Sequence, residues 1–382
     1  MIRRVLVLTS STGSGHDMRA LAFAQWCRQL FGGTPEVRIE HVIEKGSLLG
    51  RFGVWVYNTI HRHCPVLHNV YFFIVEVFVF THTRKVGFGG RYYRKILMDY
   101  RPELVFSVHD STNRGYFEDA RRVLGETVRC VTYCGEFSGG YGYSRNWVNP
   151  SADLFIARTE RARRHAVKLG IPRGKSAVFH KLLPPACFEG RMPGGEKPEH
   201  LRQLGLDPDK FTLFLATGGY GANHHSSFLR ALFPLSGKIQ VIVICGRNQT
   251  VHEKLTRWSR AHPGFRIYIE GYSNRVSDFL QLADAVVTRG GANTTMEALH
   301  FACPLVYNAL GGLMPQELCT VRYFLDRGAA RLIRSSRDLV EVIDDWGDRG
   351  EAYERVRKAM AALHVEENPE DLVRLVLGES SR

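Results

Sequence analysis

The feature that most constrains the fold is a short apolar run that recurs along the chain, followed each time by an amphipathic stretch. Runs rich in β-branched residues lie at 5–9, 104–109, 128–133 and 153–157, and again at 211–217, 239–245, 265–269, 284–288 and 304–308. These runs are continuous rather than alternating, which is typical of parallel strands covered on both faces. The pattern therefore predicts an α/β protein with doubly wound parallel sheets.

A stretch rich in proline and glycine at 184–200 interrupts this series. Such a composition ends regular structure and is typical of a linker. The chain has 382 residues, enough for two domains of ordinary size. We predict an N-terminal domain at 1–183, a linker at 184–200, a C-terminal domain at 201–368 and a terminal surface helix at 369–382.

Charge and composition limit the partners and the compartment. The net charge is +13, which implies an anionic partner: nucleic acid, anionic lipid or a phosphorylated substrate. No run is long and apolar enough to span a bilayer as a helix, and the N-terminal apolar run ends too soon for a signal peptide. The eight cysteines lack the close pairs of a structural zinc site, so we expect buried thiols without disulfides. We expect a cytoplasmic protein.

The segment 51–95 departs from the alternation because it is crowded with aromatic side chains and cations. Two interpretations remain open at this point. Rings and cations together are typical of a surface that lies on an anionic membrane. The same residues are also expected in an inserted helical subdomain whose rings form its core and whose cations form its outer face.

The first candidate site is the turn after the first strand, which contains Gly13 and Gly15 and ends at His16. Glycines let a ligand approach the backbone, and the helix that follows presents unpaired N–H groups. The glycine spacing differs from the dinucleotide fingerprint. His16 is a candidate general base, and His109, at the end of another strand, is a candidate for acceptor binding or for a structural hydrogen bond.

The second candidate site follows the strand at 284–288. Arg289 precedes a glycine turn, Gly290 and Gly291, and a helix begins there with Thr294 or Thr295 as the expected cap. The N-terminus of such a helix binds phosphate. Glu297 lies about one turn into the helix, where it would accept hydrogen bonds from a ribose or simply complement the helix dipole. The third candidate is the loop with Gln316 and Glu317, whose adjacent amide and carboxylate suit several sugar hydroxyls.

Together these motifs resemble the nucleotide-sugar transferases that include monogalactosyldiacylglycerol synthases and processive diacylglycerol glucosyltransferases, and more distantly the peptidoglycan transferase that glycosylates lipid I. The similarity covers most of the chain. It rests on the turn ending in Gly15-His16, the strand ending in Cys245-Gly246-Arg247-Asn248, the segment from Gly290 to Glu297, the loop Pro315-Gln316-Glu317, and the glycine loop with Gly218 and Gly219. Departures are Pro315 in place of a glycine, Thr320, the run Asn223-His224-His225, and Glu136 where relatives carry aspartate.

The resemblance implies a GT-B architecture of family 28 type, with two Rossmann-like domains facing a cleft. It implies that the N-terminal half binds the acceptor and the membrane, with His16 as catalytic base and with Gly13, Gly15 and His109 as acceptor-binding residues. It assigns the donor to the C-terminal half through Gly218, Gly219, Arg247, Arg289, Gly290, Gly291, Asn293, Thr294, Glu297, Gln316 and Glu317. Arg247 and Arg289 would stabilise the departing diphosphate.

We therefore expect an inverting, metal-independent glycosyltransferase, without a cofactor, that moves a hexose from a UDP-sugar to a diacylglycerol-like lipid. It would lie on the inner face of the membrane, with no nucleic acid as partner. One alternative is an N-acetylglucosamine transferase that acts on an undecaprenyl-linked or other envelope lipid. An epimerase of the same fold is a further alternative, as is a non-catalytic basic protein that binds membrane or nucleic acid.

Overall fold

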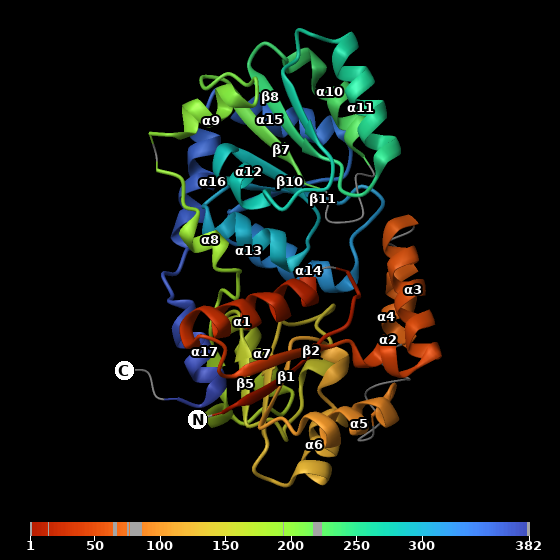
Figure 1. The fold of residues 1–382 in the computed structure, drawn as a ribbon. Helices are drawn as coiled ribbons and strands as arrows, with labels where there is room; N and C mark the ends of the chain where they lie inside the picture. The colour runs from red at the N-terminus through yellow and green to blue at the C-terminus, as the bar shows by residue number, and fades with distance from the viewer. Residues whose placement is uncertain are drawn as a thin grey trace. The chain divides into compact units, whose positions relative to one another are not determined.

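A computed structural model describes residues 2–13, 15–63, 67–74, 76, 86–193, 195–216 and 224–379, apart from the side chains of residues 61–63 and 71. The chain forms two compact units (Figure 1). Unit 1 contains Met1–Pro185, Met314–Cys319 and Val365–Arg382, and unit 2 contains Ala186–Leu313 and Thr320–His364. The division places residues 314–319 and the terminal helix with unit 1. One short helix, Ala186–Glu189, lies within the expected linker at 184–200, and a second, Lys197–Gln203, begins there.

Unit 1 is built on a six-stranded parallel sheet with the order β2-β1-β3-β4-β5-β6. Its strands are β1 (Arg4–Leu8), β2 (Glu36–Glu40), β3 (Leu104–Ser107), β4 (Arg129–Tyr133), β5 (Leu154–Ala157) and β6 (Ser176–Val178). Its helices are α1 (Gly15–Phe31), α2 (Val42–Gly46), α3 (Leu48–His63), α4 (His68–Ile74), α5 (Gly90–Tyr100), α6 (Tyr116–Leu124), α7 (Glu160–Lys168) and α17 (Pro369–Leu377).

Unit 2 repeats this plan with a six-stranded parallel sheet in the order β12-β11-β10-β7-β8-β9. Its strands are β7 (Phe211–Leu215), β8 (Ile239–Ile244), β9 (Ile267–Glu270), β10 (Ala285–Thr288), β11 (Leu305–Asn308) and β12 (Ala330–Ile333). Its helices are α8 (Ala186–Glu189), α9 (Lys197–Gln203), α10 (His225–Leu232), α11 (Gln249–Ala261), α12 (Val276–Leu282), α13 (Ala292–His300), α15 (Ser336–Trp346) and α16 (Glu351–Ala362). Helix α14 (Pro315–Leu325) belongs to unit 1 up to Cys319 and to unit 2 from Thr320.

The nine predicted strands and the two doubly wound sheets are confirmed. Strands β1, β3, β4, β5, β7, β8, β10 and β11 are almost entirely buried, because helices cover both faces of each sheet. The three strands that the sequence did not predict, β2, β6 and β12, all lie at sheet edges. Since all strands are parallel, their carboxyl ends meet at one edge of each sheet, where ligands bind in such folds.

Buried thiols are the rule, as expected. Seven cysteines are free and buried. The eighth, Cys64, lies outside the described residues. No helix formed by the described residues has the length and apolar character needed to cross a membrane.

Within the segment 369–382, where a terminal surface helix was predicted, helix α17 covers Pro369–Leu377, and one of its faces is buried. Leu372, Val373 and Val376 are fully buried. Arg129 donates hydrogen bonds to the carbonyl oxygens of Leu375 and Val376 at the end of this helix, where a cation also complements the helix dipole. The helix is therefore an integral part of unit 1.

Candidate functional site

The glycine turn after β1 is fixed by a side chain from helix α3. Gly13 has a φ of +78°, a conformation that favours glycine. Its N–H donates to Oδ1 of Asn58 at 3.0 Å, and Nδ2 of Asn58 donates to the carbonyl oxygen of Ser11 at 2.9 Å. Gly15 is the first residue of α1. The turn that carries His16 is thus held by two hydrogen bonds from the aromatic segment.

His16 is half-buried next to the end of β3. Its Nδ1 lies 2.9 Å from the carbonyl oxygen of Val108, which can only accept, and 2.6 Å from Nη2 of Arg19, which can only donate. Nδ1 is thus occupied by contacts within the fold, and Nε2 forms no hydrogen bond with the described residues. Burial lowers the pKa of His16 well below 6.5, and the neighbouring His109 and Arg19 lower it further. The ring is therefore neutral at pH 7, in the form that a general base requires.

Both ring nitrogens of His109 form hydrogen bonds with other residues of unit 1. Its Nδ1 accepts from the backbone N–H of Ser111 at 3.0 Å, so Nε2 is protonated and donates to Oγ1 of Thr12 at 2.7 Å. The ring centroids of His16 and His109 are 4.2 Å apart. Of the two roles left open for His109, these contacts favour the structural one: it ties the glycine turn to the end of β3.

A third titratable group, Glu136, faces the same region. Nε1 of Trp147 donates to Glu136 at 3.4 Å, and the ring of Trp147 stacks on His16 with centroids 6.1 Å apart. Burial raises the pKa of Glu136 to about 7, although the cations of Arg19 and Arg158 oppose this shift. A carboxyl group with a pKa near neutrality next to a neutral histidine is typical of a functional site.

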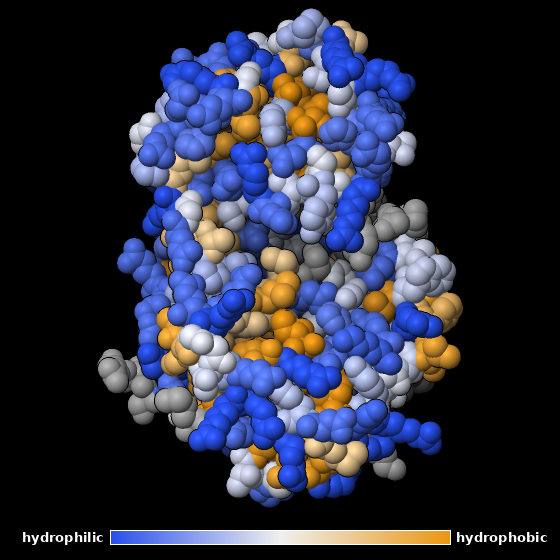
Figure 2. All heavy atoms as spheres, viewed as in Figure 1, coloured by the Kyte–Doolittle hydropathy of each residue, from blue (hydrophilic) through white to orange (hydrophobic). Residues whose placement is uncertain are grey.

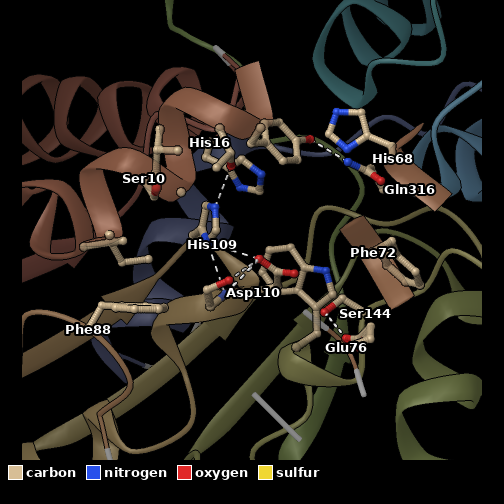
Figure 3. A pocket seen from close by; sticks show the side chains of 18 of the residues that line it. Ser10, His16, His68, Phe72, Glu76, Phe88, His109, Asp110, Ser144 and Gln316 are labelled. Atoms are coloured by element: carbon tan, nitrogen blue, oxygen red, sulfur yellow. Dashed lines mark hydrogen bonds and ion pairs between the residues drawn. The ribbon is translucent and has the colours of Figure 1, made fainter. Parts of the chain in front are cut away.

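These groups line one cavity of unit 1, with a volume of about 190 Å³ (Figure 3). Its polar lining comprises Ser10, Thr12, His16, His68, Glu76, His109, Asp110, Ser111, Glu136, Ser144 and Gln316. Its other lining residues are Ile43, Leu49, Gly50, Gly53, Val54, Tyr57, Phe72, Phe88 and Trp147. None of the described lining residues is a lysine or an arginine, whereas three are carboxylates. The cavity therefore suits an uncharged ligand that has both hydroxyl groups and apolar surface.

Glu76, two residues after the end of α4, lines this cavity and is held by three hydrogen bonds. The carboxylate accepts hydrogen bonds from Oγ of Ser144 at 2.6 Å, from the N–H of Arg145 at 3.0 Å and from Nδ2 of Asn146 at 3.2 Å. Burial raises the pKa of this carboxyl group as well. In the sequence Glu76 interrupts an apolar run, and the structure explains this polar position by its partners in the segment before β5.

The raised pKa of Glu136 predicts a pH-dependent stability. Its folded pKa of about 7 exceeds the ordinary 4.5, so its stabilising effect is complete below pH 4.5 and is lost as the pH rises through 7. One pKa unit corresponds to ~1.4 kcal/mol, which sets an upper limit of about 3 kcal/mol. We expect Glu136→Gln to raise the free energy of unfolding at pH 8 more than at pH 4.5, as measured by urea denaturation. An equal effect at both values would contradict the assignment.

Gln316 and Glu317, expected at the donor sugar, group with unit 1 at the start of α14. The carboxylate of Glu317 accepts from the N–H of Met314 at 2.8 Å and so caps the first turn of the helix. Pro315 occupies the first helical position, where its fixed φ and missing N–H are tolerated. Pro315 in place of the usual glycine is thus compatible with the helix start. Gln316 lines the cavity of unit 1.

The remaining donor candidates lie in unit 2, at the carboxyl ends of β8 and β10. Helix α13 begins at Ala292 with Gly291 as its N-cap, and no side-chain cap is present among the described residues. The prediction that Thr294 or Thr295 caps this helix is wrong, because both lie inside it and Thr295 contacts the hydroxyl of Tyr307. Asn293 and Thr294 lie in the first turn of the helix, shortly after Gly290. This is the position expected of residues that bind the donor phosphates at a helix N-terminus.

Glu297 projects from the second turn of α13, and it is half-buried. The described residues show no hydrogen bond or ion pair to its carboxylate. Burial raises the pKa of Glu297 to about 7. Carboxylates in such surroundings are usually paired, so this one is a strong candidate for accepting hydrogen bonds from a ligand.

The two cations proposed for the diphosphate have contacts in the fold. Nη2 of Arg289 donates to the carbonyl oxygen of Gly312 at 2.8 Å. The guanidinium of Arg247 lies over the ring of Tyr272, 4.9 Å from its centroid. Tyr272 is an exposed aromatic residue that the sequence analysis did not single out. Gly218, Gly219 and Asn223 lie outside the described residues, so the predicted glycine loop is not part of this description.

Residues 212–365 match the glycosyltransferase family 28 C-terminal domain. The chain carries this domain, and the protein is a glycosyltransferase. It is 21% identical to a processive diacylglycerol β-glucosyltransferase of Bacillus subtilis over 382 residues, which are 99% of this chain and 96% of that protein. It is 24% identical to a probable chloroplastic monogalactosyldiacylglycerol synthase of Glycine max, over 95% of this chain and 68% of that protein.

Solved structures share the fold of this glycosyltransferase. MurG of Acinetobacter baumannii aligns with a TM-score of 0.62 at 14% identity, covering 98% of this chain and 99% of that one. The UDP-GlcNAc 2-epimerase of Neisseria meningitidis bound to UDP-GlcNAc aligns with a TM-score of 0.60 at 12% identity, covering 98% of each chain. The predicted GT-B fold is thereby confirmed. Because transferases and an epimerase share it, the acceptor must be inferred from the site.

Proposed function

We propose that the protein transfers a hexose from a UDP-sugar to a hydroxyl group of an uncharged, diacylglycerol-like lipid at a membrane surface. The observation that carries the proposal is the cavity of unit 1, which combines a neutral histidine with carboxylates and apolar walls and, among its described lining residues, no cation. An acceptor with a diphosphate would meet Glu76, Asp110 and Glu136, and the described lining residues include no lysine or arginine that could bind it. The relatives named above act on diacylglycerol, which agrees with an uncharged acceptor.

In this reaction His16 removes the proton from the acceptor hydroxyl through Nε2 while the hydroxyl oxygen attacks the anomeric carbon. The bond from that carbon to the UDP oxygen breaks, so a single displacement inverts the configuration. The cations Arg247 and Arg289 and the N-terminus of α13 would stabilise the leaving diphosphate, so we expect no metal requirement. Glu297 would hold the ribose.

Contact with the membrane is supported by helices α3 and α4. Their exposed side chains include Leu48, Leu49, Phe52, Trp55, Val70, Phe73 and Ile74, of which Leu48 is 75% exposed and Trp55 is 61% exposed. Figure 2 shows apolar side chains at the edge of the molecule where these helices lie in Figure 1. Isolated apolar side chains are common on surfaces, but such a group on two neighbouring helices is typical of a membrane contact.

Helix α5, by contrast, agrees with the second interpretation of the segment 51–95, in which the aromatic side chains form a core and the cations form its outer face. Tyr93, Ile96 and Leu97 are buried in the core of unit 1, and Arg94 pairs with Asp119. Phe78, Phe80, Arg84 and Lys85 lie outside the described residues. We therefore assign the membrane contact to α3 and α4 and a packing role to α5.

An acceptor panel tests the choice of lipid. The protein is incubated with labelled UDP-hexoses and vesicles that contain either diacylglycerol or a polyprenyl-diphosphate-linked sugar. The proposal predicts label in the organic phase with diacylglycerol and at least ~10-fold less with the diphosphate lipid, since one unfavourable charge contact changes binding by about that factor. The reverse order would contradict the assignment of an uncharged acceptor.

A further inference from the structure

The proposed acceptor limits which groups of the unit 1 cavity can bind it. Diacylglycerol has a single hydroxyl group, whose proton goes to His16 in the proposed reaction. Its other polar atoms are the oxygens of its ester groups, which can only accept hydrogen bonds. Burying an ester carbonyl without a donor is unfavourable, so the lining of the cavity is expected to contain a group that donates to it.

The serine hydroxyls of the lining already donate to carboxylates within the fold, at distances of 2.6 to 3.2 Å. These pairs are Ser10 with Glu44, Ser111 with Asp110, and Ser144 with Glu76, of which the last is drawn in Figure 3. The described lining residues include no lysine or arginine. The donor for an ester must therefore be sought among the other polar residues of the cavity.

The two glutamates of the lining differ in the number of donors that face them. The carboxylate of Glu76 accepts three hydrogen bonds, which favour its ionised form. Glu136 accepts one, from Nε1 of Trp147, and at 3.4 Å this is a long contact. No described residue forms an ion pair with Glu136. A carboxyl group with so few partners retains its proton more readily than one with three.

Burial is the largest influence on the pKa of Glu136 and raises it to about 7. The cations of Arg19 on α1 and Arg158 after β5 oppose this shift, whereas the carboxylate of Asp110 after β3 reinforces it. The ring of His16 is neutral and adds no charge. About half of the molecules therefore carry the proton at pH 7, and about nine tenths do so one pH unit lower.

Trp147 determines which oxygen of Glu136 carries that proton. Its Nε1 can only donate, so Oε1 of Glu136 must accept and the proton lies on Oε2. Oε2 has no hydrogen-bond partner among the described residues, and Glu136 lines the cavity. The ring of Trp147 is almost fully buried and stacks on His16, which keeps it in place. The protonated carboxyl group thus offers an O–H donor close to the histidine that receives the acceptor proton.

We propose that Glu136 donates a hydrogen bond from Oε2 to an ester carbonyl oxygen of the lipid acceptor, and so selects ester-linked over ether-linked lipids. The inference rests on the proposed function, because it concerns the lipid that receives the hexose. A dialkylglycerol has the same hydroxyl group and similar apolar chains but no carbonyl oxygen, so it leaves the donor unpaired. Ionisation of Glu136 removes the donor and places a carboxylate against the carbonyl oxygen.

The test compares diacylglycerol with a dialkylglycerol of the same chain length, in vesicles of the same anionic phospholipid and at saturating UDP-hexose. The measured quantity is the ratio of kcat/KM for the diacyl lipid to that for the dialkyl lipid. We expect a ratio of ~10 at about pH 6, the value of one hydrogen bond, and a fall toward equality as the pH rises through 7. Effects of pH on the base, the donor or the vesicles act on both lipids and cancel in the ratio.

Two variants at position 136 should give opposite results. Glu136→Ala removes the donor, so the two lipids should be used about equally at every pH. Glu136→Gln keeps a donor that does not ionise, because the amide oxygen faces Nε1 of Trp147 and the amide nitrogen replaces Oε2. Its preference for the diacyl lipid should persist at alkaline pH. Glu160→Gln is the matched control, since Glu160 pairs with Arg163 on α7 at 2.7 Å and does not line the cavity.

The outcomes are distinct. Equal use of both lipids by the intact protein at every pH, or a preference that does not change with pH, would overturn the inference. A preference that persists in Glu136→Ala would also overturn it, because another residue of the lining, such as Thr12, would then bind the ester. The pH series on the intact protein does not depend on the folding of any variant. Transfer to neither lipid would contradict the proposed function itself, and the inference would fail with it.

Discussion

His16→Ala is expected to lower the rate of hexose transfer by ~100-fold or more and to leave the affinity for the UDP-sugar nearly unchanged. The reason is that the low pKa keeps the ring of His16 neutral, and that contacts to Val108 and Arg19 occupy Nδ1, which leaves Nε2 for the acceptor hydroxyl. Turnover at saturating donor and the dissociation constant for UDP, measured by calorimetry, provide the two readouts. An equal loss in both would show that His16 supports the fold and not the proton transfer.

His41→Ala is a suitable control for this variant. His41 lies next to the same turn, where its Nε2 contacts Asp17 at 3.0 Å, but it does not line the cavity. If disturbance of the turn alone explained the loss, His41→Ala would reproduce it. The pH profile gives a second check. Because burial lowers the pKa of His16, the base stays deprotonated below pH 6.5, and kcat/KM should decline only at more acidic pH.

Glu297→Ala is expected to weaken UDP binding by ~10- to 100-fold, the effect of losing a charged acceptor for hydrogen bonds from the ribose. Glu297 is half-buried in α13, shows no hydrogen bond or ion pair among the described residues, and has a pKa raised to about 7. Titration of UDP by calorimetry measures the change directly. Glu341→Ala is the matched control, since Glu341 forms an exposed pair with Arg337 on α15.

The raised pKa of Glu297 also predicts that UDP binding is coupled to the release of a proton. Hydrogen bonds from ribose hydroxyls stabilise the ionised carboxylate, so UDP binding should release a proton from Glu297 near pH 7. The release appears as a dependence of the binding enthalpy on the ionisation enthalpy of the buffer, and Glu297→Gln should abolish it. An unaltered UDP dissociation constant in Glu297→Ala would rule out the ribose role.

Most strands could be predicted from the sequence because helices cover both faces of them. Strand β8 is buried at all six positions and is apolar at every position except Gln240. Strand β2 carries two glutamates and an arginine in five residues, and β6 has only three residues, none fully buried. Edge strands have a neighbour on one side only and less burial, so their sequences lose the apolar signal on which the prediction depends.

The candidate site was also predicted only in part: residues next to regular elements could be found from the sequence, and residues that act through distant contacts could not. His16 and Glu297 follow or begin regular elements, and their places at strand ends could be inferred from local sequence. Asn58 could not be predicted, because it acts on a residue 45 positions away through a hydrogen bond. The unit to which Gln316 belongs also depends on such contacts. Long-range pairing leaves no periodic pattern in a single sequence.

The central claim is that a hexose passes from a UDP-sugar to an uncharged lipid, and one measurement tests it most directly. The protein is incubated with labelled UDP-hexose and vesicles of diacylglycerol with anionic phospholipid, and the organic phase is counted. The account predicts that label moves into a glycolipid when diacylglycerol is present, and not when His16 is replaced by alanine. UDP-hexose binding without any labelled lipid in the intact protein would contradict it.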